Sequence, residues 1–170
     1  MSQAPLDDLT MEGYEAPRVV QFNVFLDNRV GRLLELVELF EKQSVCIAGL
    51  SIMDSADYAV IRLVCGKSGV ARRHLHDHHV PFSEEEVLAV GLSHGRTLAS
   101  LCRSLLQAEI NMDYAYPLLI QPSGVAAVIV HTDEPDLTAQ VLKRSQFLLL
   151  GEADLCQPGR SPGSSGEPSI

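Results

Sequence analysis

The residues best suited to bind a small molecule lie at a single strand-to-helix junction. Alternating apolar residues end at Leu26, a polar turn that contains Gly31 follows, and a helical pattern begins directly after it. Glycine permits a tight backbone turn, and the first amides of a helix have no acceptor inside the helix. Helped by the helix dipole, such amides bind a carboxylate or phosphate, and Asn28 adds a side chain that both donates and accepts. The alternative is an ordinary turn in which Asn28 caps the helix and Gly31 provides only backbone geometry.

A second group of candidate residues is the tract His74–His79, which contains four histidines and one aspartate. Neutral imidazole is a common zinc ligand. On a helix, however, His74 and His78 share a face while His76 points elsewhere, and the spacing matches no hydrolase signature. We therefore expect no resident metal and keep a metal-dependent enzyme only as a remote alternative. The motifs His-Glu-x-x-His and Gly-x-Gly-x-x-Gly after a strand do not occur, so we assign no catalytic residue and no cofactor and expect a protein that is not an enzyme.

The elements that position these residues follow a β-α-β-β-α-β order that occurs twice. In the first copy, hydrophobic periodicity and turn residues predict a strand at 20–26, a helix at 33–41, strands at 46–53 and 58–65, a helix at 68–77 and an extended segment at 80–82. In the second copy they predict a strand at 87–92, a helix around 98–105, an extended segment at 110–119, a strand at 125–131, a helix from about 133 and a strand at 147–150.

The two copies align at a constant offset of 65 residues. Leu33, Leu36, Phe40, Val45 and Ile47 correspond to Leu98, Leu101, Leu105, Ile110 and Met112. A repeat of this length is a duplicated domain, because each copy is long enough to bury a helix layer on a sheet. The predicted fold is therefore α+β, with two ferredoxin-like βαββαβ units in tandem and antiparallel sheets that carry their helices on one face.

Composition sets the domain boundaries. We expect a flexible tail at 1–17, a first domain at 18–83, a second domain at 84–151, and a disordered tail rich in Pro, Gly and Ser at 152–170. The acidic run Glu84–Glu86 is interpreted as a solvated linker between the copies.

The overall composition excludes several classes of partner. The chain has 170 residues, with 13 Lys and Arg against 22 Asp and Glu and a formal charge of −9. Such an acidic surface argues against nucleic-acid binding, and no apolar run is long enough to span a membrane. The N-terminus lacks a signal-peptide pattern, and the four cysteines are scattered singly. These features predict a cytoplasmic protein with free, mostly buried thiols.

The stretch Val20–Cys65 resembles the ACT domain, the small-molecule-sensing βαββαβ module of amino-acid metabolism. The resemblance is carried by residues 25–33 (FLDNRVGRL), 45–52 (VCIAGLSI) and the hairpin at 53–63, and more weakly in the second copy by residues 108–116. The whole chain is similar to stand-alone tandem ACT proteins. This resemblance implies a non-catalytic regulatory protein that forms a homodimer and binds a free amino acid effector between ACT units. A regulatory subunit of a biosynthetic enzyme, like the small subunit of acetolactate synthase, is the alternative; there, however, the second half does not repeat the first.

The resemblance also implies which residues contact the effector. The loop amides of Arg32 and Leu33 beside Gly31 would hold the carboxylate, Asn28 would hold polar groups, and Asp27 and Val30 complete the loop. Val30 stands where the family usually has proline. The predicted site also includes two apolar wall residues and one asparagine of the second copy, namely Ile52, Met53 and Asn111. The second loop, residues 93–98, is one residue shorter and its glycine is displaced, which predicts a composite or single site.

Overall fold

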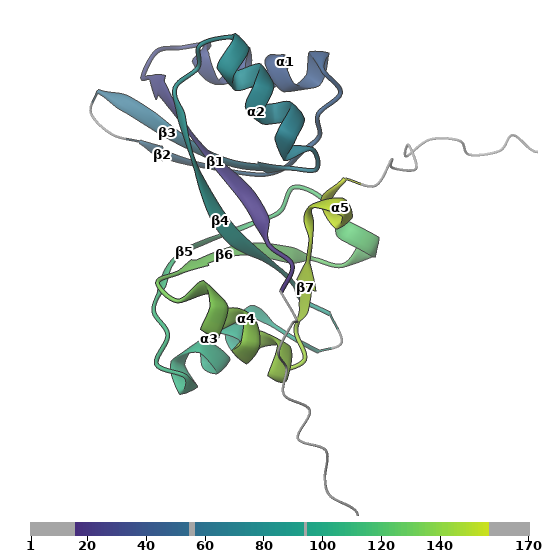
Figure 1. Ribbon diagram of the computed structural model, residues 1–170. Helices are drawn as coiled ribbons and strands as arrows, with labels where there is room; N and C mark the ends of the chain where they lie inside the picture. The colour runs from purple at the N-terminus through teal and green to yellow at the C-terminus, as the bar shows by residue number, and fades with distance from the viewer. Residues whose placement is uncertain (1–15, 55–56, 94, 157–170) are drawn as a thin grey trace, which may run out of the picture.

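Two βαββαβ units follow one another along the chain, as Figure 1 shows. The computed structural model describes residues 16–54, 57–93 and 95–156. The first unit contains β1 (Val19–Asp27), α1 (Arg32–Lys42), β2 (Ile47–Asp54), β3 (Tyr58–Cys65), α2 (Ser68–Asp77) and β4 (Phe82–Gly91). The second continues from β4 with α3 (Leu98–Gln107), β5 (Met112–Pro117), the short helix η1 (Pro122–Gly124), β6 (Ala127–Thr132), α4 (Pro135–Arg144) and β7 (Leu148–Leu150). The tandem ferredoxin-like fold expected from the sequence is confirmed.

Strand β4 belongs to both units. The sheet order is β2-β3-β1-β4-β6-β5, with β7 also beside β4. The first half of β4 pairs antiparallel with β1, where Phe82 lies opposite Val24, and the second half pairs with β6 and β7. The predicted boundary between residues 83 and 84 therefore falls inside a strand. One strand that completes the first sheet and begins the second leaves no room for a linker between the copies.

The interpretation of Glu84–Glu86 as a solvated linker is wrong. All three glutamates lie in β4 opposite β1, and each carboxylate accepts hydrogen bonds from side chains outside β4. Arg72 of α2 binds Glu84 at 2.6 Å, and Arg18 binds Glu86 at 2.6 Å. Glu85 faces the opposite side and accepts a hydrogen bond from the Tyr114 hydroxyl at 2.8 Å. These partners make an acidic strand stable.

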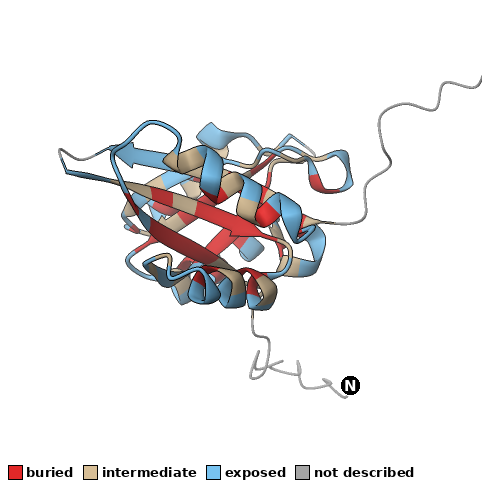
Figure 2. Cartoon of the chain, turned by 90° about the horizontal axis from the view of Figure 1, so that it is seen from above, coloured by how far each residue is buried: buried red, intermediate tan, exposed pale blue. Residues whose placement is uncertain are grey.

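The offset of 65 residues corresponds to equivalent positions in two separate helix-facing cores. Leu36, Phe40 and Val45 are buried in the first core, and their counterparts Leu101, Leu105 and Ile110 are buried in the second. Even the helix ends match, because Ser44 and Glu109 both adopt a positive φ just after α1 and α3. Figure 2 shows the buried residues along the strands and the exposed ones on the outward surfaces of the helices.

The helix-free faces of the two sheets pack against each other and form a third core. Val19 and Val64 of the first unit pack in the same cluster as Ala127 and Ile129 of the second. The segment after β5 is also joined to β2, because the Leu119 N–H donates a hydrogen bond to the Ala48 carbonyl oxygen at 2.8 Å. Each sheet carries its helices on one face, and its opposite face is partly covered by the other sheet.

The chain end returns to the first unit, which corrects the predicted tail at 152–170. Residues Glu152–Leu155 form a short helix, α5, and Leu155 is fully buried between the sheets. The Glu152 carboxylate accepts hydrogen bonds from the Ser68 amide at 2.6 Å and from its hydroxyl at 2.7 Å. In the N-terminal tail, Ala16 packs against the second core. Residues 1–15 and 157–170 lie outside the described residues.

The prediction of free thiols is wrong for two of the four cysteines. Cys46 before β2 and Cys156 after α5 form a disulfide, with Cα atoms 6.2 Å apart, within the range that disulfides span. The return of α5 brings together residues that are 110 positions apart in the sequence. Cys65 and Cys102 are free thiols, and burial raises the pKa of the Cys65 thiol to about 11.

Candidate functional site

The loop between β1 and α1 leaves the start of the helix open. Gly31 is the N-cap residue, with a φ of 93°, and none of the side chains that the structure describes caps the helix. The Arg32 amide donates to the Arg29 carbonyl at 3.3 Å. Across residues 16–54, 57–93 and 95–156, the Leu33 amide has no acceptor. Of the two amides predicted to hold a carboxylate, that of Leu33 is therefore free, whereas that of Arg32 is weakly engaged.

Asn28 ties this loop to the end of β2. Its side-chain amide donates to Oδ1 of Asp54 at 3.0 Å, which leaves the Asn28 carbonyl oxygen and the second Asp54 oxygen without a bond to any described residue. Beside it, Arg29 forms an ion pair with Asp27 at 2.6 Å. The sequence did not identify Asp54 as a site residue, because it falls in the predicted turn between the strands at 46–53 and 58–65. Its position at the start of that turn was the available signal, since β2 and the β1–α1 loop end on the same side of the unit.

The apolar residues assigned to the site are accessible. Val30 projects fully into solvent, and Ile52 and Met53 near the end of β2 are about half exposed. Met53 Sδ lies 3.9 Å from Nη2 of Arg62, which is on the neighbouring strand β3. Arg32 differs from these residues, because its side chain folds along α1 and forms an ion pair with Glu35 at 2.6 Å.

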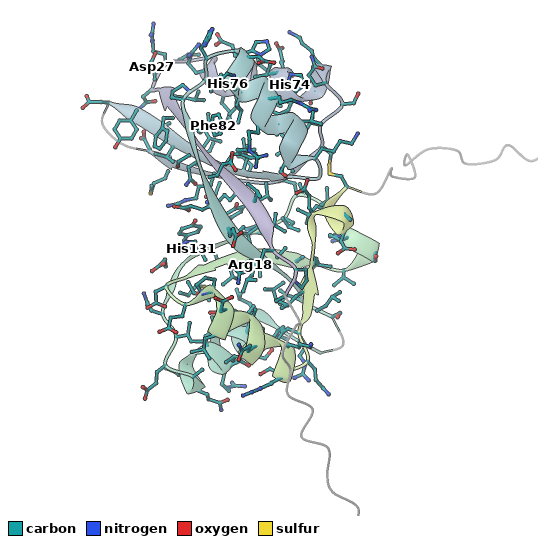
Figure 3. All side chains as sticks on the ribbon, viewed as in Figure 1. Arg18, Asp27, His74, His76, Phe82 and His131 are labelled. Atoms are coloured by element: carbon teal, nitrogen blue, oxygen red, sulfur yellow. A yellow bond between two sulfur atoms is a disulfide. The ribbon has the colours of Figure 1, made fainter. Side chains whose placement is uncertain are left out.

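Asn111 is not brought to the loop by any contact of the described residues. Its side chain donates to Asp113 at 3.2 Å, and Asp113 in turn binds His131 Nδ1 at 2.9 Å. Figure 3 shows His131 well apart from Asp27 of the first loop. Within one chain, the structure thus gathers residues 27–33 and 52–54 at one end of the first unit and leaves Asn111 in the second.

The equivalent loop of the second unit is closed by its own side chains. Thr97 caps α3 by accepting a bond from the Ser100 amide at 3.1 Å, and the Ser100 hydroxyl accepts from the Thr97 amide at 2.8 Å. This reciprocal capping box satisfies the amides of Thr97 and Ser100. The start of α3 therefore has a side-chain cap, whereas no described side chain caps the start of α1.

The histidine tract does not form a metal centre in the described part of the chain. Figure 3 labels His74 and His76 on α2. The rings of His74 and His78 lie 6.4 Å apart, and His78 Nδ1 lies 2.9 Å from the His74 carbonyl oxygen. Across the described ranges, no three His, Cys, Asp or Glu side chains converge on a common point.

The duplicated unit and the shared strand define a tandem pair of ferredoxin-like modules. The family model of the ACT domain pair matches residues 18–157, and the chain belongs to this family. Membership supports a regulatory role that involves small-molecule binding. No curated protein matches the chain, and no helix of the described residues is long and apolar enough to cross a membrane.

Solved structures show the same arrangement. Protein BT0572 from Bacteroides thetaiotaomicron is 27% identical, with a TM-score of 0.72, and the match covers 82% of this chain and 96% of that one. The ligand-free regulatory subunit of aspartate kinase from Thermus thermophilus is 8% identical, with a TM-score of 0.50 and coverage of 76% and 93%. The second likeness concerns the fold alone.

Proposed function

We propose that this protein is a non-catalytic regulator that binds a free amino acid at the β1–α1 loop of its first unit. The observation that carries the proposal is the open helix start at Gly31, where the Leu33 amide has no acceptor among the described residues. An amide at a helix N-terminus binds an anionic group such as the effector carboxylate.

The surroundings of the open amide are complementary to a zwitterion. Asp54 lies at the same end of the unit and keeps one carboxylate oxygen free of described partners, so it would hold the ammonium group. The Asn28 carbonyl oxygen adds a second acceptor for that group. Val30, Ile52 and Met53 are exposed beside the loop and would contact the effector's side chain. Asn111 of a partner subunit would complete the site in a homodimer.

The fold gives the binding event a route to the rest of the molecule. β1 precedes the loop directly and pairs with β4, which continues into the second unit. An effector that binds one arrangement of the units better than another would shift the population toward it. In our proposal, an amino-acid biosynthetic enzyme receives this change and is regulated by it. The Thermus thermophilus neighbour is described as the regulatory subunit of aspartate kinase, and we propose a comparable role for this chain.

A thermal-shift screen against the standard amino acids tests this proposal. At least one should raise the melting temperature at millimolar concentration, because a ligand that binds only the folded state stabilises it, by about 2.7 kcal/mol at 100 times its Kd. The substitution Asn28→Ala should abolish that shift. The matched control is Ser93→Ala, at the corresponding position of the second copy, which should keep it. The absence of any stabilising amino acid, or an equal loss in both variants, would contradict the proposal.

A further inference from the structure

A cavity opens between α1 and the connection from α2 to β4, and the Arg32 residue that follows the loop described above is part of its lining. Its volume is about 330 Å³, within the range of small-molecule sites. The floor is apolar and includes Leu26, Leu36, Leu39 and Val80. The rim is polar and includes Arg32, Glu35, Lys42, His78 and His79. An apolar floor beneath a rim with several cationic or protonatable groups favours an amphipathic anion.

Arg32 has an incomplete set of hydrogen bonds at this cavity. Its Nη1 donates to Glu35 at 2.6 Å, whereas its buried Nε has no partner among the described residues. In a guanidinium, the Nε–H and Nη2–H groups form one edge that matches the two oxygens of a carboxylate. A buried donor without an acceptor is unfavourable, so an oxyanion that reached this edge would gain a charge-assisted bond and remove that cost.

The other charges of the rim add to this preference. Lys42 is the last residue of α1. Its Nζ atom lies 3.9 Å from the Glu38 carboxylate, so the ion pair is long. His78 and His79 stand opposite α1, at the end of α2. Glu35 is the single carboxylate that lines the cavity, and it is already bound by Arg32. A bound anion would therefore be attracted by Arg32 and Lys42, and no unpaired carboxylate in the lining would repel it.

We propose that this cavity is a second ligand site, which takes a small organic anion with a carboxylate-like head and an aliphatic body. The head binds the Nε–Nη2 edge of Arg32, and the body covers Leu36, Leu39 and Val80. The site goes beyond the amino-acid site, because neither Asn28 nor Asp54 lines the cavity. A zwitterion is a poor ligand here, since its ammonium group has no free carboxylate in the lining.

The experiment uses three probes with the same tail, hexanoate, hexanol and hexylamine, and follows the full-length protein by two-dimensional ¹H–¹⁵N NMR. Titration with hexanoate should shift the Arg32 Nε–H resonance and the amide resonances of Leu39 and Val80, and all three should follow the same saturable binding curve. Hexylamine should leave these resonances unshifted. Arg32→Lys keeps the charge but removes the planar edge, and it should weaken hexanoate at least tenfold. Arg29→Lys is the matched control, because Arg29 binds Asp27 outside the cavity, and it should leave the affinity unchanged.

Three results would overturn the inference. They are equal binding of hexanol and hexanoate, an equal loss in the two lysine variants, and no saturable shift at millimolar hexanoate. Circular dichroism of each variant establishes that it is folded before its affinity is compared. Asn28→Ala separates this site from the proposed amino-acid site, because it should leave hexanoate binding intact. Hexanoate binding without amino-acid binding would contradict the proposed function alone.

Discussion

The two β–α loops occupy equivalent places in a duplicated fold, yet they treat the start of the following helix in opposite ways. In the first, α1 follows Gly31, and no described side chain caps it. In the second, Thr97 and Ser100 form a complete capping box at α3. A cap stabilises a helix by satisfying its first amides, and the same bonds remove those amides from ligand binding.

This difference shows where the copies have been free to diverge. The apolar positions that fill the helix-facing cores are retained at the offset of 65, as Leu36 and Leu101 illustrate. The loops lie outside these cores, so a change there costs little packing. One copy has an open helix start and the other a stabilised one, which favours one amino-acid site per chain.

The largest predicted effect concerns the covalent link between the copies. Cys46 is bonded to Cys156, whereas its counterpart in the second copy is Asn111, whose side chain donates a hydrogen bond to Asp113. A disulfide that closes a loop of this length restricts the unfolded chain, by about 5 kcal/mol in the chain-entropy model. Cys156→Ser should lower the free energy of unfolding by about that amount, measured by urea denaturation.

The matched control for this variant is Cys102→Ser, which removes an exposed free thiol and should leave stability nearly unchanged. Alkylation of the denatured, unreduced protein should label two cysteines, and labelling of four would show that the link is absent. If Cys156→Ser is as stable as the parent chain, the contacts of Leu155 and Glu152 hold α5 without the disulfide.

The next effect tests the polar contact between the two sheets. The Tyr116 hydroxyl donates to the side-chain oxygen of Gln21 at 2.8 Å, and both residues are buried. Tyr116→Phe leaves that oxygen without its donor, so the free energy of unfolding at neutral pH should fall by about 1 to 3 kcal/mol. Tyr58→Phe is the control, because Tyr58 is about half exposed and should change stability little.

The same tyrosines predict a dependence on alkaline pH. Burial raises the pKa of Tyr114 to about 12 from its ordinary value of 10, and it also raises the pKa of Tyr116. Because the unfolded chain loses these phenolic protons first, stability is fully present below pH 10 and falls as the pH rises toward 12. Urea titrations in this interval should show a smaller fall for Tyr116→Phe than for the parent. An equal fall would contradict the role of Tyr116.

Periodicity in the sequence was enough to predict the elements and their duplication. The predicted ranges 58–65 and 68–77 coincide with β3 and α2, because local apolar spacing and turn residues determine where these elements begin and end. The core pairs at offset 65 were also correct, because each copy packs its own helices. The open loop at Gly31 was found for the same reason, since a strand end, a glycine and a helix start are adjacent in the chain.

The missed features depend on residues that are distant in the sequence. The run Glu84–Glu86 has the composition of a linker, but it pairs with β1, and Arg18, Arg72 and Tyr114 bind its carboxylates. Cys46 and Cys156 meet because α5 returns to the first unit. The cavity at Arg32 likewise needs the end of α2 beside α1. Local patterns carry no information about such pairings, which arise only when segments distant in the sequence pack together.

The smallest effect sharpens the comparison of the two loops. Gly31 and Gly95 both have a positive φ, of 93° and 76°, and a Cβ added to either would meet no atom within 4 Å. Alanine at each position should therefore lower the free energy of unfolding by a similar amount, about 1 kcal/mol, through backbone strain alone. Binding should separate the two variants, because only Gly31 shapes an uncapped helix start. Gly31→Ala should lose the amino-acid thermal shift and Gly95→Ala should keep it, when both are compared with the parent by calorimetry. A loss of the shift in Gly95→Ala, with Gly31→Ala unaffected, would mean that the capped loop is the working one.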